Sequence, residues 1–504
     1  MEQTFPFHWF LIAFAAYTAL LFVISGLTLR KAGTDSFFDG GRKAPWLAVA
    51  YGMVGSSISG VTFISVPGNV WVQNFFYMPL VLGFAVGYVV IAKVLLPLYY
   101  RRNLTSIYTY LGERFGRKSH MTGTSFFILS RLLGAAVRIF VVIVVFKSFI
   151  PQPAALSDLS VFTVTSVVFL VLLYLYTFRG GVKTIIWTDV LQTTFMLLAV
   201  GLTISHICRD MDWNAAAMWS AVTSTPNALT EGHCYADWFN WDWKAGTNAV
   251  KQFISGIFIT VAMTGLDQAM MQKNLACKDL RAAQKNMYTT GIIIVLVNAF
   301  FLLMGALLCV FVADKGGFES LGILKTDEMF PAVASRYLGF GTCLFFLIGL
   351  ISASYPSAGA ALTSLTTSVC VDIFGFKDRT DINDSGKERI RKWIHACVAF
   401  VFLLILIVLY LVSNDAVVNL VYKLASYTYG PLMGMFFFGI LTDCKVRDRA
   451  TPWIAAASPL LCLAINLIGR NCLGFDLGFS LLIVNGLLTF LGMWLFRIRK
   501  TEKI

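Results

Sequence analysis

Small and hydroxyl-bearing residues are concentrated in VGSSISGVTFISVPG (54–68), a stretch with apolar residues on both sides. Gly55 and Gly60 lower the cost of a non-helical backbone, and Pro67 has no amide hydrogen to donate. A helix that breaks inside lipid leaves carbonyl oxygens without partners, and other groups must satisfy them. Several such oxygens can share one sodium ion, so this stretch is a candidate cation site. Tight helix packing through glycine and serine is the alternative.

A second set of oxygen donors lies far along the chain, in GLISASYPSAGAALTSLTTSVCVDIF (349–374). Ser354 and Ser357 are about one helical turn apart, so their hydroxyls would face the same way. Pro356 leaves the carbonyl of Ser352 without its helical partner. The segment is therefore a second candidate surface for the same cation.

Charged residues also occur inside apolar segments, where each requires a partner or water. Arg138 lies deep in such a segment, and its guanidinium suits the carboxylate of a solute. A permanent partner such as Asp267 is the alternative. Asp267 itself is expected in a cytoplasmic gate or an ion pair with the lysines that follow it. Asp189 is expected either to contribute to an ion site or to cap or salt-bridge its helix.

The composition predicts the elements that must position these residues. Of 504 residues, 57% are hydrophobic and only 13% are charged, which is typical of a polytopic membrane protein and not of a soluble enzyme. An all-α fold follows, because long apolar segments recur along the whole chain. We expect thirteen transmembrane helices, at 8–29, 46–72, 78–100, 120–150, 158–178, 182–208, 248–272, 283–313, 338–368, 390–412, 416–441, 451–469 and 475–497.

The formal net charge of +13 is distributed as in a membrane protein. Most lysines and arginines, Lys273 and Lys278 among them, fall in alternate loops that become cytoplasmic if the N-terminus is outside. This pattern predicts the N-terminus outside and the C-terminus inside, and leaves no surplus charge for nucleic acid. The first helix reads as a retained anchor. The cysteines show no metal-site spacing, and a pairing of Cys208 with Cys234 stays open.

The segment 248–272 repeats the character of 46–72 five spans later. It carries several polar residues, and we expect it to break at Ser255 and Gly256. Paired discontinuous segments in corresponding halves of a chain indicate an inverted-repeat secondary transporter.

The chain resembles the sodium/solute symporter family, which includes sodium–glucose, proline, sialic acid, iodide and monocarboxylate carriers. Four motifs, in the family's order and spacing, carry the resemblance: SSISGVTFISVPG (56–68), LPLYYRRNLTSIYTYLGERFG (96–116), YTFRGGVKTIIWTDVLQ (176–192) and LASYTYGPLMGMFFFGILT (424–442).

The resemblance implies a leucine-transporter-like architecture in which five helices are repeated in inverted orientation. It divides the single transmembrane domain (1–504) as follows: an extra N-terminal helix and loop at 8–45, the first repeat at 46–208, the second repeat at 248–441, and two additional helices with a tail at 451–504.

The resemblance also implies a sodium site made of oxygens of Gly55, Ile58, Ala353, Ser354 and Ser357. Pro356 stands where many members have a further hydroxyl. Gly359 and Ala360 replace the hydroxyls of a second ion site, for which Asp189 alone remains. The candidate substrate-binding residues are Ser57, Ser59, Thr62, Phe63, Arg138, Ser255, Phe258 and Tyr427, and Tyr77 and Tyr429 are further candidate aromatic gates.

We expect sodium-coupled symport of a small organic solute by alternating access, with sodium as the coupling ion and no other cofactor. Arg138 favours a carboxylate such as sialic acid or another sugar acid, and a neutral sugar comes next. The expected setting is a monomer in the lipid bilayer of a bacterial cytoplasmic membrane. A proton-coupled carrier and a sensor on a transporter scaffold are the alternatives, while no residue spacing predicts an enzyme.

Overall fold

The computed structural model describes residues 6–29, 44–102, 104, 106–151, 157–177, 182–230, 232–376, 381, 383–412 and 417–498. Within them the regular structure is helical, apart from isolated β-bridges, which confirms the prediction of an all-α protein. The loop after the first helix, the glycine pair of the third motif and the end of the C-terminal tail lie outside the described residues.

The α-helices, in chain order, are α1 (Phe7–Leu29), α3 (Trp46–Ser57), α4 (Gly60–Gln73), α5 (Met78–Val90), α6 (Leu96–Arg101), α7 (Thr109–Phe115), α8 (Arg117–Ser148), α9 (Asp158–Thr177), α10 (Val182–Asp210), α11 (Ala215–Ser224), α12 (Ala249–Thr260), α13 (Gln268–Leu275), α14 (Leu280–Asp314), α15 (Met329–Arg336), α16 (Gly339–Ser368), α17 (Asp384–Val412), α18 (Val417–Leu441), α19 (Thr451–Leu473) and α20 (Leu481–Leu495). π-helical turns extend three of them, at Ile91–Leu95, Val261–Gly265 and Val369–Ile373, and 3₁₀ turns lie at Thr326–Glu328 and Gly478–Ser480.

The first expected break divides 46–72 into α3 and α4, which meet at an angle of 58°. Ile58 and Ser59 have extended backbone dihedrals at this point, with ψ values of 98° and 179°. Pro67 lies inside α4 and does not end it. The backbone is therefore open only at the two residues between the helices.

The second break lies elsewhere than the sequence predicts. Ser255 and Gly256 are inside α12, and the chain bends by 70° only before α13, at Leu266 and Asp267. A methyl group at Gly256 would collide with the carbonyl oxygen of Leu80 on α5. The placement of the break at Gly256 was wrong because this glycine allows close packing of two helices and not a bend.

Eleven helices in the described part of the chain are long and apolar enough to cross a membrane, and the two bent pairs bring this number to as many as thirteen. Several helices extend beyond the expected apolar segments. Thus α8 begins at Arg117 and α17 begins at Asp384, because a helix can continue past the hydrocarbon with charged residues in its first turns.

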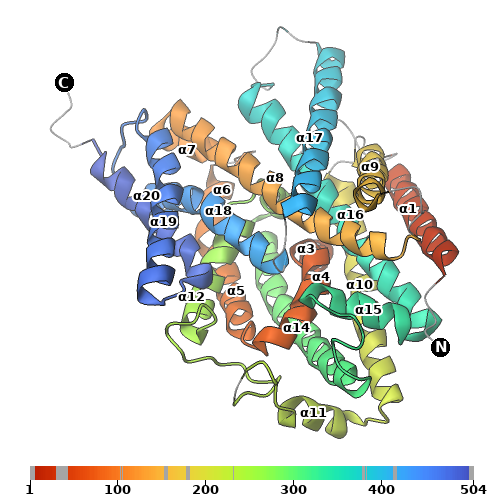
Figure 1. Cartoon of the computed structure of the whole chain (residues 1–504). Helices are drawn as coiled ribbons and strands as arrows, with labels where there is room; N and C mark the ends of the chain where they lie inside the picture. The colour runs from red at the N-terminus through yellow and green to blue at the C-terminus, as the bar shows by residue number, and fades with distance from the viewer. Residues whose placement is uncertain are drawn as a thin grey trace.

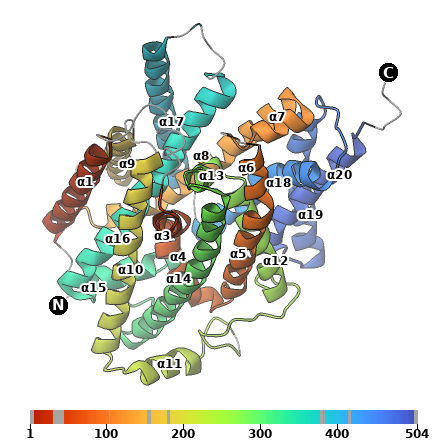
Figure 2. The same cartoon turned by 180° about the vertical axis from the view of Figure 1, so that it is seen from behind.

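The broken pair α3–α4 lies in the middle of the bundle (Figure 1). One face of α3 packs against α10, and α14 packs along both halves (Figure 2). α16 contacts α10, α8 and both α3 and α4, while α12 packs along α5 and α18 packs on α8 and α20. The break is thus surrounded by helices from both ends of the chain, and each can place side chains there.

Candidate functional site

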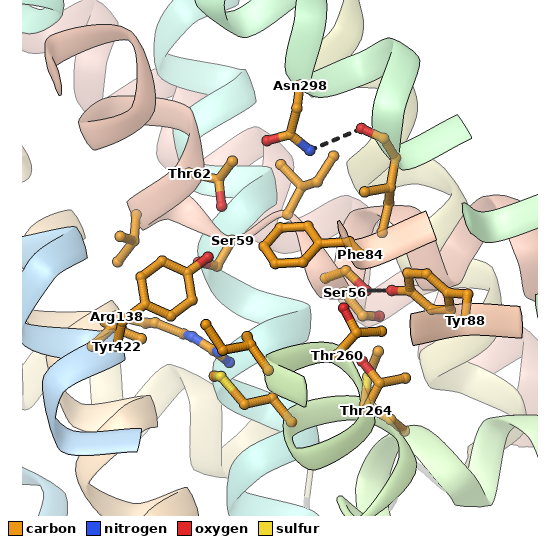
Figure 3. Close-up of a pocket in the computed structure, with 18 of the residues that line it drawn as sticks. Ser56, Ser59, Thr62, Phe84, Tyr88, Arg138, Thr260, Thr264, Asn298 and Tyr422 are labelled. Atoms are coloured by element: carbon orange, nitrogen blue, oxygen red, sulfur yellow. Dashed lines mark hydrogen bonds between the residues drawn. The ribbon is translucent and has the colours of Figure 1, made fainter. Parts of the chain in front are cut away.

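A cavity lies beside the break between α3 and α4. Its walls come from α3, α4, α5, α8, α12, α13, α14 and α18 (Figure 3). The lining residues are Ser56, Ser57, Ile58, Ser59, Val61, Thr62, Tyr77, Phe84, Tyr88, Arg131, Arg138, Ile259, Thr260, Met263, Thr264, Met270, Ile294, Asn298, Val421 and Tyr422.

Half of the residues predicted to bind the solute line this cavity, namely Ser57, Ser59, Thr62 and Arg138. The hydroxyl of Ser57 lies 3.1 Å from that of Tyr88, which comes from α5. The open backbone at the break lets the consecutive residues 57–59 share one cavity, which a continuous helix would not allow. The side-chain half of the break is therefore polar and faces the cavity.

The other four predicted solute contacts, Phe63, Ser255, Phe258 and Tyr427, lie outside the cavity lining. Phe63 is fully buried among phenylalanines, with its ring 5.6 Å from one on α16. Ser255 lies 3.0 Å from the hydroxyl of Ser480, and the ring of Phe258 packs on an aromatic residue of α18. Phe63, Ser255 and Phe258 thus contact other segments of the protein rather than the cavity.

Two arginines from α8 face the cavity, and they differ in their partners. Nη1 of Arg131 lies 3.3 Å from Oδ2 of Asp267, which also accepts a hydrogen bond from the hydroxyl of Tyr429 at 3.0 Å. Oδ1 of Asp267 accepts from the backbone of Met270 and so caps α13. Asp267 thus forms a buried ion pair with an arginine and not with the lysines that follow it.

Arg138 has no hydrogen bond or ion pair with any residue that the structure describes. Its side chain enters the cavity on the same side as Tyr422, opposite Tyr88 (Figure 3). A buried guanidinium needs an acceptor or water, and it can bind a carboxylate through two parallel hydrogen bonds. The cavity therefore contains one positively charged group that is available to a ligand.

The backbone half of the break faces away from the cavity toward α10 and α16. The carbonyl oxygens of Gly55, Ile58 and Ala353 lie 2.6, 3.3 and 3.5 Å from one atom, Nε2 of Gln192. Three oxygens predicted to bind sodium are thus close to one point. Gln192 was not among the predicted site residues, although it lies three residues after Asp189 and so on the same helix face.

The two predicted serine ligands are buried on α16. The hydroxyl of Ser354 donates to the carbonyl of Ile351 at 2.7 Å, which leaves its oxygen lone pairs free to bind a cation. Ser357 is 6% exposed. Both residues follow Ala353 within about one turn, so they belong to the same part of α16 as the third carbonyl.

Asp189 forms a buried salt bridge. Nζ of Lys273 lies 2.5 Å from Oδ2 of Asp189, and the hydroxyl of Ser56 donates to the same oxygen at 2.7 Å. Lys273 is only 3% exposed and lies inside α13, so its assignment to a loop was wrong. Asp189 was expected either to contribute to an ion site or to form a cap or salt bridge, and in the structure it forms a salt bridge. This salt bridge and the Ser56 hydrogen bond join α10, α3 and α13.

Tyr77, a candidate aromatic gate, also lines the cavity, together with Tyr422 and Asn298, which were not singled out from the sequence. The hydroxyls of Tyr77 and Tyr422 are 2.8 Å apart and connect α18 to the segment before α5. Thr264 also lines the cavity. The amide of Asn298 inside an apolar helix was a usable signal, whereas tyrosines in membrane helices are too common to identify a site.

Two broken helices that lie across a bundle of apolar helices, with a polar cavity at one break, define a secondary transporter. A family model described as "Sodium:solute symporter family" matches residues 37–448. The chain belongs to the sodium:solute symporter family, and it is therefore a multi-pass membrane transporter and not an enzyme.

The chain is also similar in sequence to several named sodium-coupled transporters. A sodium/sialic acid symporter of Aliivibrio fischeri is 23% identical over 89% of this chain and 86% of its own length. A sodium/sialic acid symporter of Proteus mirabilis is 21% identical over 94% of this chain and 91% of its own length. Human sodium-coupled monocarboxylate transporter 1 is 24% identical over 81% of this chain and 64% of its own length.

Solved structures show the same fold. A sodium-coupled sialic acid symporter has a TM-score of 0.79, with 17% identity and 97% of both chains covered. Mhp1, a nucleobase-cation-symport-1 family transporter, has a TM-score of 0.58, with 13% identity over 91% of this chain and 94% of its own. Family membership confirms the prediction of sodium as the coupling ion, and the fold of the solved structures confirms the leucine-transporter-like fold.

Proposed function

We propose that this sodium:solute symporter imports a small organic carboxylate, which binds in the cavity through Arg138. The observation that carries the proposal is the contrast between the two arginines of α8. Arg131 is neutralised by Asp267, while Arg138 has no acidic partner among the described residues. A cation that faces a small-molecule cavity is expected to pair with a ligand of opposite charge.

A sugar acid such as sialic acid is the favoured solute, with a neutral sugar next. Support comes from the names of two relatives, which are sodium/sialic acid symporters. Hydroxyl and amide groups of Ser57, Thr260 and Asn298 line the same cavity and can bind sugar hydroxyls. Apolar groups such as Phe84 can cover the apolar faces of a sugar ring.

We place sodium among the carbonyl oxygens of Gly55, Ile58 and Ala353, with the hydroxyls of Ser354 and Ser357 as further ligands. Support comes from the convergence of the three carbonyls and from the free lone pairs of Ser354. An ion here would join the end of α3 to α16.

The break between α3 and α4 explains how the ion and the solute are coupled. Residues 55–59 contribute carbonyl oxygens to the proposed ion site and side chains to the cavity. An ion that fixes the conformation of this segment also fixes the solute site, so each ligand strengthens the binding of the other. Alternating access would follow when both sites are filled.

The finer topology is also a proposal. We infer thirteen spans, with the N-terminus outside and the C-terminus inside, and two inverted repeats at 46–208 and 248–441. Support comes from the loop charges and from the two broken helices. We further propose that the chain acts as a monomer in the bilayer.

Neutralisation of Arg138 tests the carboxylate proposal. Arg138→Gln should weaken sodium-dependent binding of sialic acid by about 10–100-fold, because a hydrogen bond to a charged group contributes about 1.5–3 kcal/mol. Binding of the neutral sugar N-acetylmannosamine should change little. Binding is measured by thermal shift of the purified protein in sodium.

The matched control is Arg470→Gln, which removes an exposed arginine on α19 and should leave binding unchanged. Arg138→Lys keeps the charge but not the two parallel donors, and it should give an intermediate affinity. If Arg138→Gln binds sialic acid as tightly as the unmodified protein, the carboxylate proposal is wrong.

A further inference from the structure

The amide group of Gln192 lies where the proposed sodium ligands converge. The side chain is fully buried on α10, and its Nε2 atom is within hydrogen-bond distance of the carbonyls of Gly55 and Ile58. α10 can approach this closely because residue 55 is glycine, since a methyl group there would collide with the hydroxyl of Thr193. The position of the amide is thus fixed by the packing of α3 on α10.

These carbonyls have no helical partner of their own. Gly55 is in the last turn of α3 and Ile58 follows its end. Because the backbone is extended at Ile58 and Ser59, neither carbonyl oxygen accepts a helical N–H group. The amide nitrogen of Gln192 donates to them in place of a backbone N–H group. An amide carries only a partial charge, which makes it a weaker partner for several oxygens than a cation would be.

The other end of the same amide has no partner. Oε1 of Gln192 is buried and accepts no hydrogen bond from any residue that the structure describes. An acceptor left buried and unpaired costs about 1–3 kcal/mol. Rotation of the amide by half a turn would bring this oxygen toward the carbonyls of Gly55, Ile58 and Ala353. Four oxygens would then repel one another unless a cation lies between them.

We propose that Gln192 is a ligand of the coupling ion and that its amide has two orientations. In the orientation that the structure has, the NH₂ group binds the carbonyl oxygens, and in the other the Oε1 atom turns inward and joins them around the ion. This inference rests on the proposed sodium site. It also adds an oxygen donor to a ligand set in which position 356 is a proline and offers no hydroxyl.

Two substitutions separate this role from the alternatives. Gln192→Leu removes both the oxygen and the NH₂ group at nearly constant size, while Gln192→Glu replaces the NH₂ group with a second oxygen. If the oxygen binds sodium, leucine should weaken sodium binding and glutamate should strengthen it. If the NH₂ group only competes with sodium, both substitutions should strengthen it.

The experiment measures the sodium concentration at half-maximal thermal stabilisation of the purified full-length protein, with choline replacing sodium at constant ionic strength. We expect Gln192→Leu to raise this concentration at least about tenfold, which corresponds to about 1.4 kcal/mol, and Gln192→Glu to lower it. An unchanged or lower value for Gln192→Leu would overturn the ligand role. Should that variant not fold, Gln192→Asn, which is one methylene shorter, must raise the value, and an unchanged or lower value overturns the role.

Gln252→Leu is the matched control, because Gln252 is a buried glutamine on α12 whose amide faces the carbonyl of Gly246. It should leave the sodium dependence unchanged. If the unmodified protein responds equally to sodium and choline, the sodium site itself is overturned, and the Gln192 role with it. If it responds to sodium but Gln192→Leu behaves like the unmodified protein, only the Gln192 role fails.

Discussion

At the scale of single residues, partners within the protein distinguish the structural charges from those available to ligands. Asp189 is paired with Lys273, and Asp267 with Arg131, and all four side chains are largely buried. Removing one partner of a buried ion pair leaves an uncompensated charge, which is more costly than removing both. Arg138 is different because it has no ion pair with a described residue, and Asp267, the acid that acts on it at longer range, is already paired with Arg131.

This difference predicts the behaviour of the pair between α10 and α13. Lys273→Met should destabilise the protein by on the order of 3–5 kcal/mol, because Asp189 would remain buried without its cation. The double variant Asp189→Asn with Lys273→Met should recover most of the loss. Thermal unfolding in detergent measures both.

The corresponding control removes an exposed ion pair. Lys392 and Glu388 form such a pair on α17, and Lys392→Met should change the unfolding temperature little. Equal destabilisation by the single and double variants of the buried pair would contradict its role as a mutually compensating pair.

The sequence predicted individual residues of the site better than it predicted which residues they contact. Gly55 and Ile58 follow from the chemistry of a broken helix and from a family motif, and their carbonyls do converge with that of Ala353. Gln192 and Lys273 were missed as parts of the site because their contacts are made between helices far apart in the chain. Such contacts depend on how helices rotate about their axes, which hydropathy does not determine.

At the scale of elements, the two broken helices differ in how visible they are in the sequence. The break at Ile58 is surrounded by glycines and serines, whereas the second break has only Gly265 directly before it. The more prominent Ser255–Gly256 pair belongs to a helix contact. Glycine in a membrane helix indicates either a bend or close packing, and the sequence alone does not separate them.

The close contact between α12 and α5 can be tested directly. Gly256→Ala should destabilise the protein by about 1–3 kcal/mol, because the added methyl group meets the backbone carbonyl of Leu80 and neither helix can yield locally. Thermal unfolding of the purified variant gives the measurement.

Gly201→Ala serves as the control for that substitution. Gly201 is on α10 with open space around its Cα, so alanine should be neutral or slightly stabilising there, by up to about 1 kcal/mol. If Gly256→Ala is as stable as Gly201→Ala, close packing does not explain the glycine at position 256, and a role in bending the helix is favoured instead.

At the scale of the whole molecule, the transporter class was predictable because hydropathy and loop charge extend over the entire chain. Family membership and the all-α fold are confirmed. Hydropathy and loop charge do not identify the solute, because its site is made by side chains from eight helices whose relative positions the sequence does not give. The shared segment 55–59 is the feature that connects the ion site to this cavity.

The central claim is that sodium drives the solute across the membrane through this shared segment. The most direct test is uptake of labelled sialic acid by proteoliposomes that contain the purified protein. We predict uptake only with an inward sodium gradient, and none when potassium or choline replaces sodium, even with an inward proton gradient. Equal uptake in potassium or choline, or uptake driven by protons alone, would contradict the account.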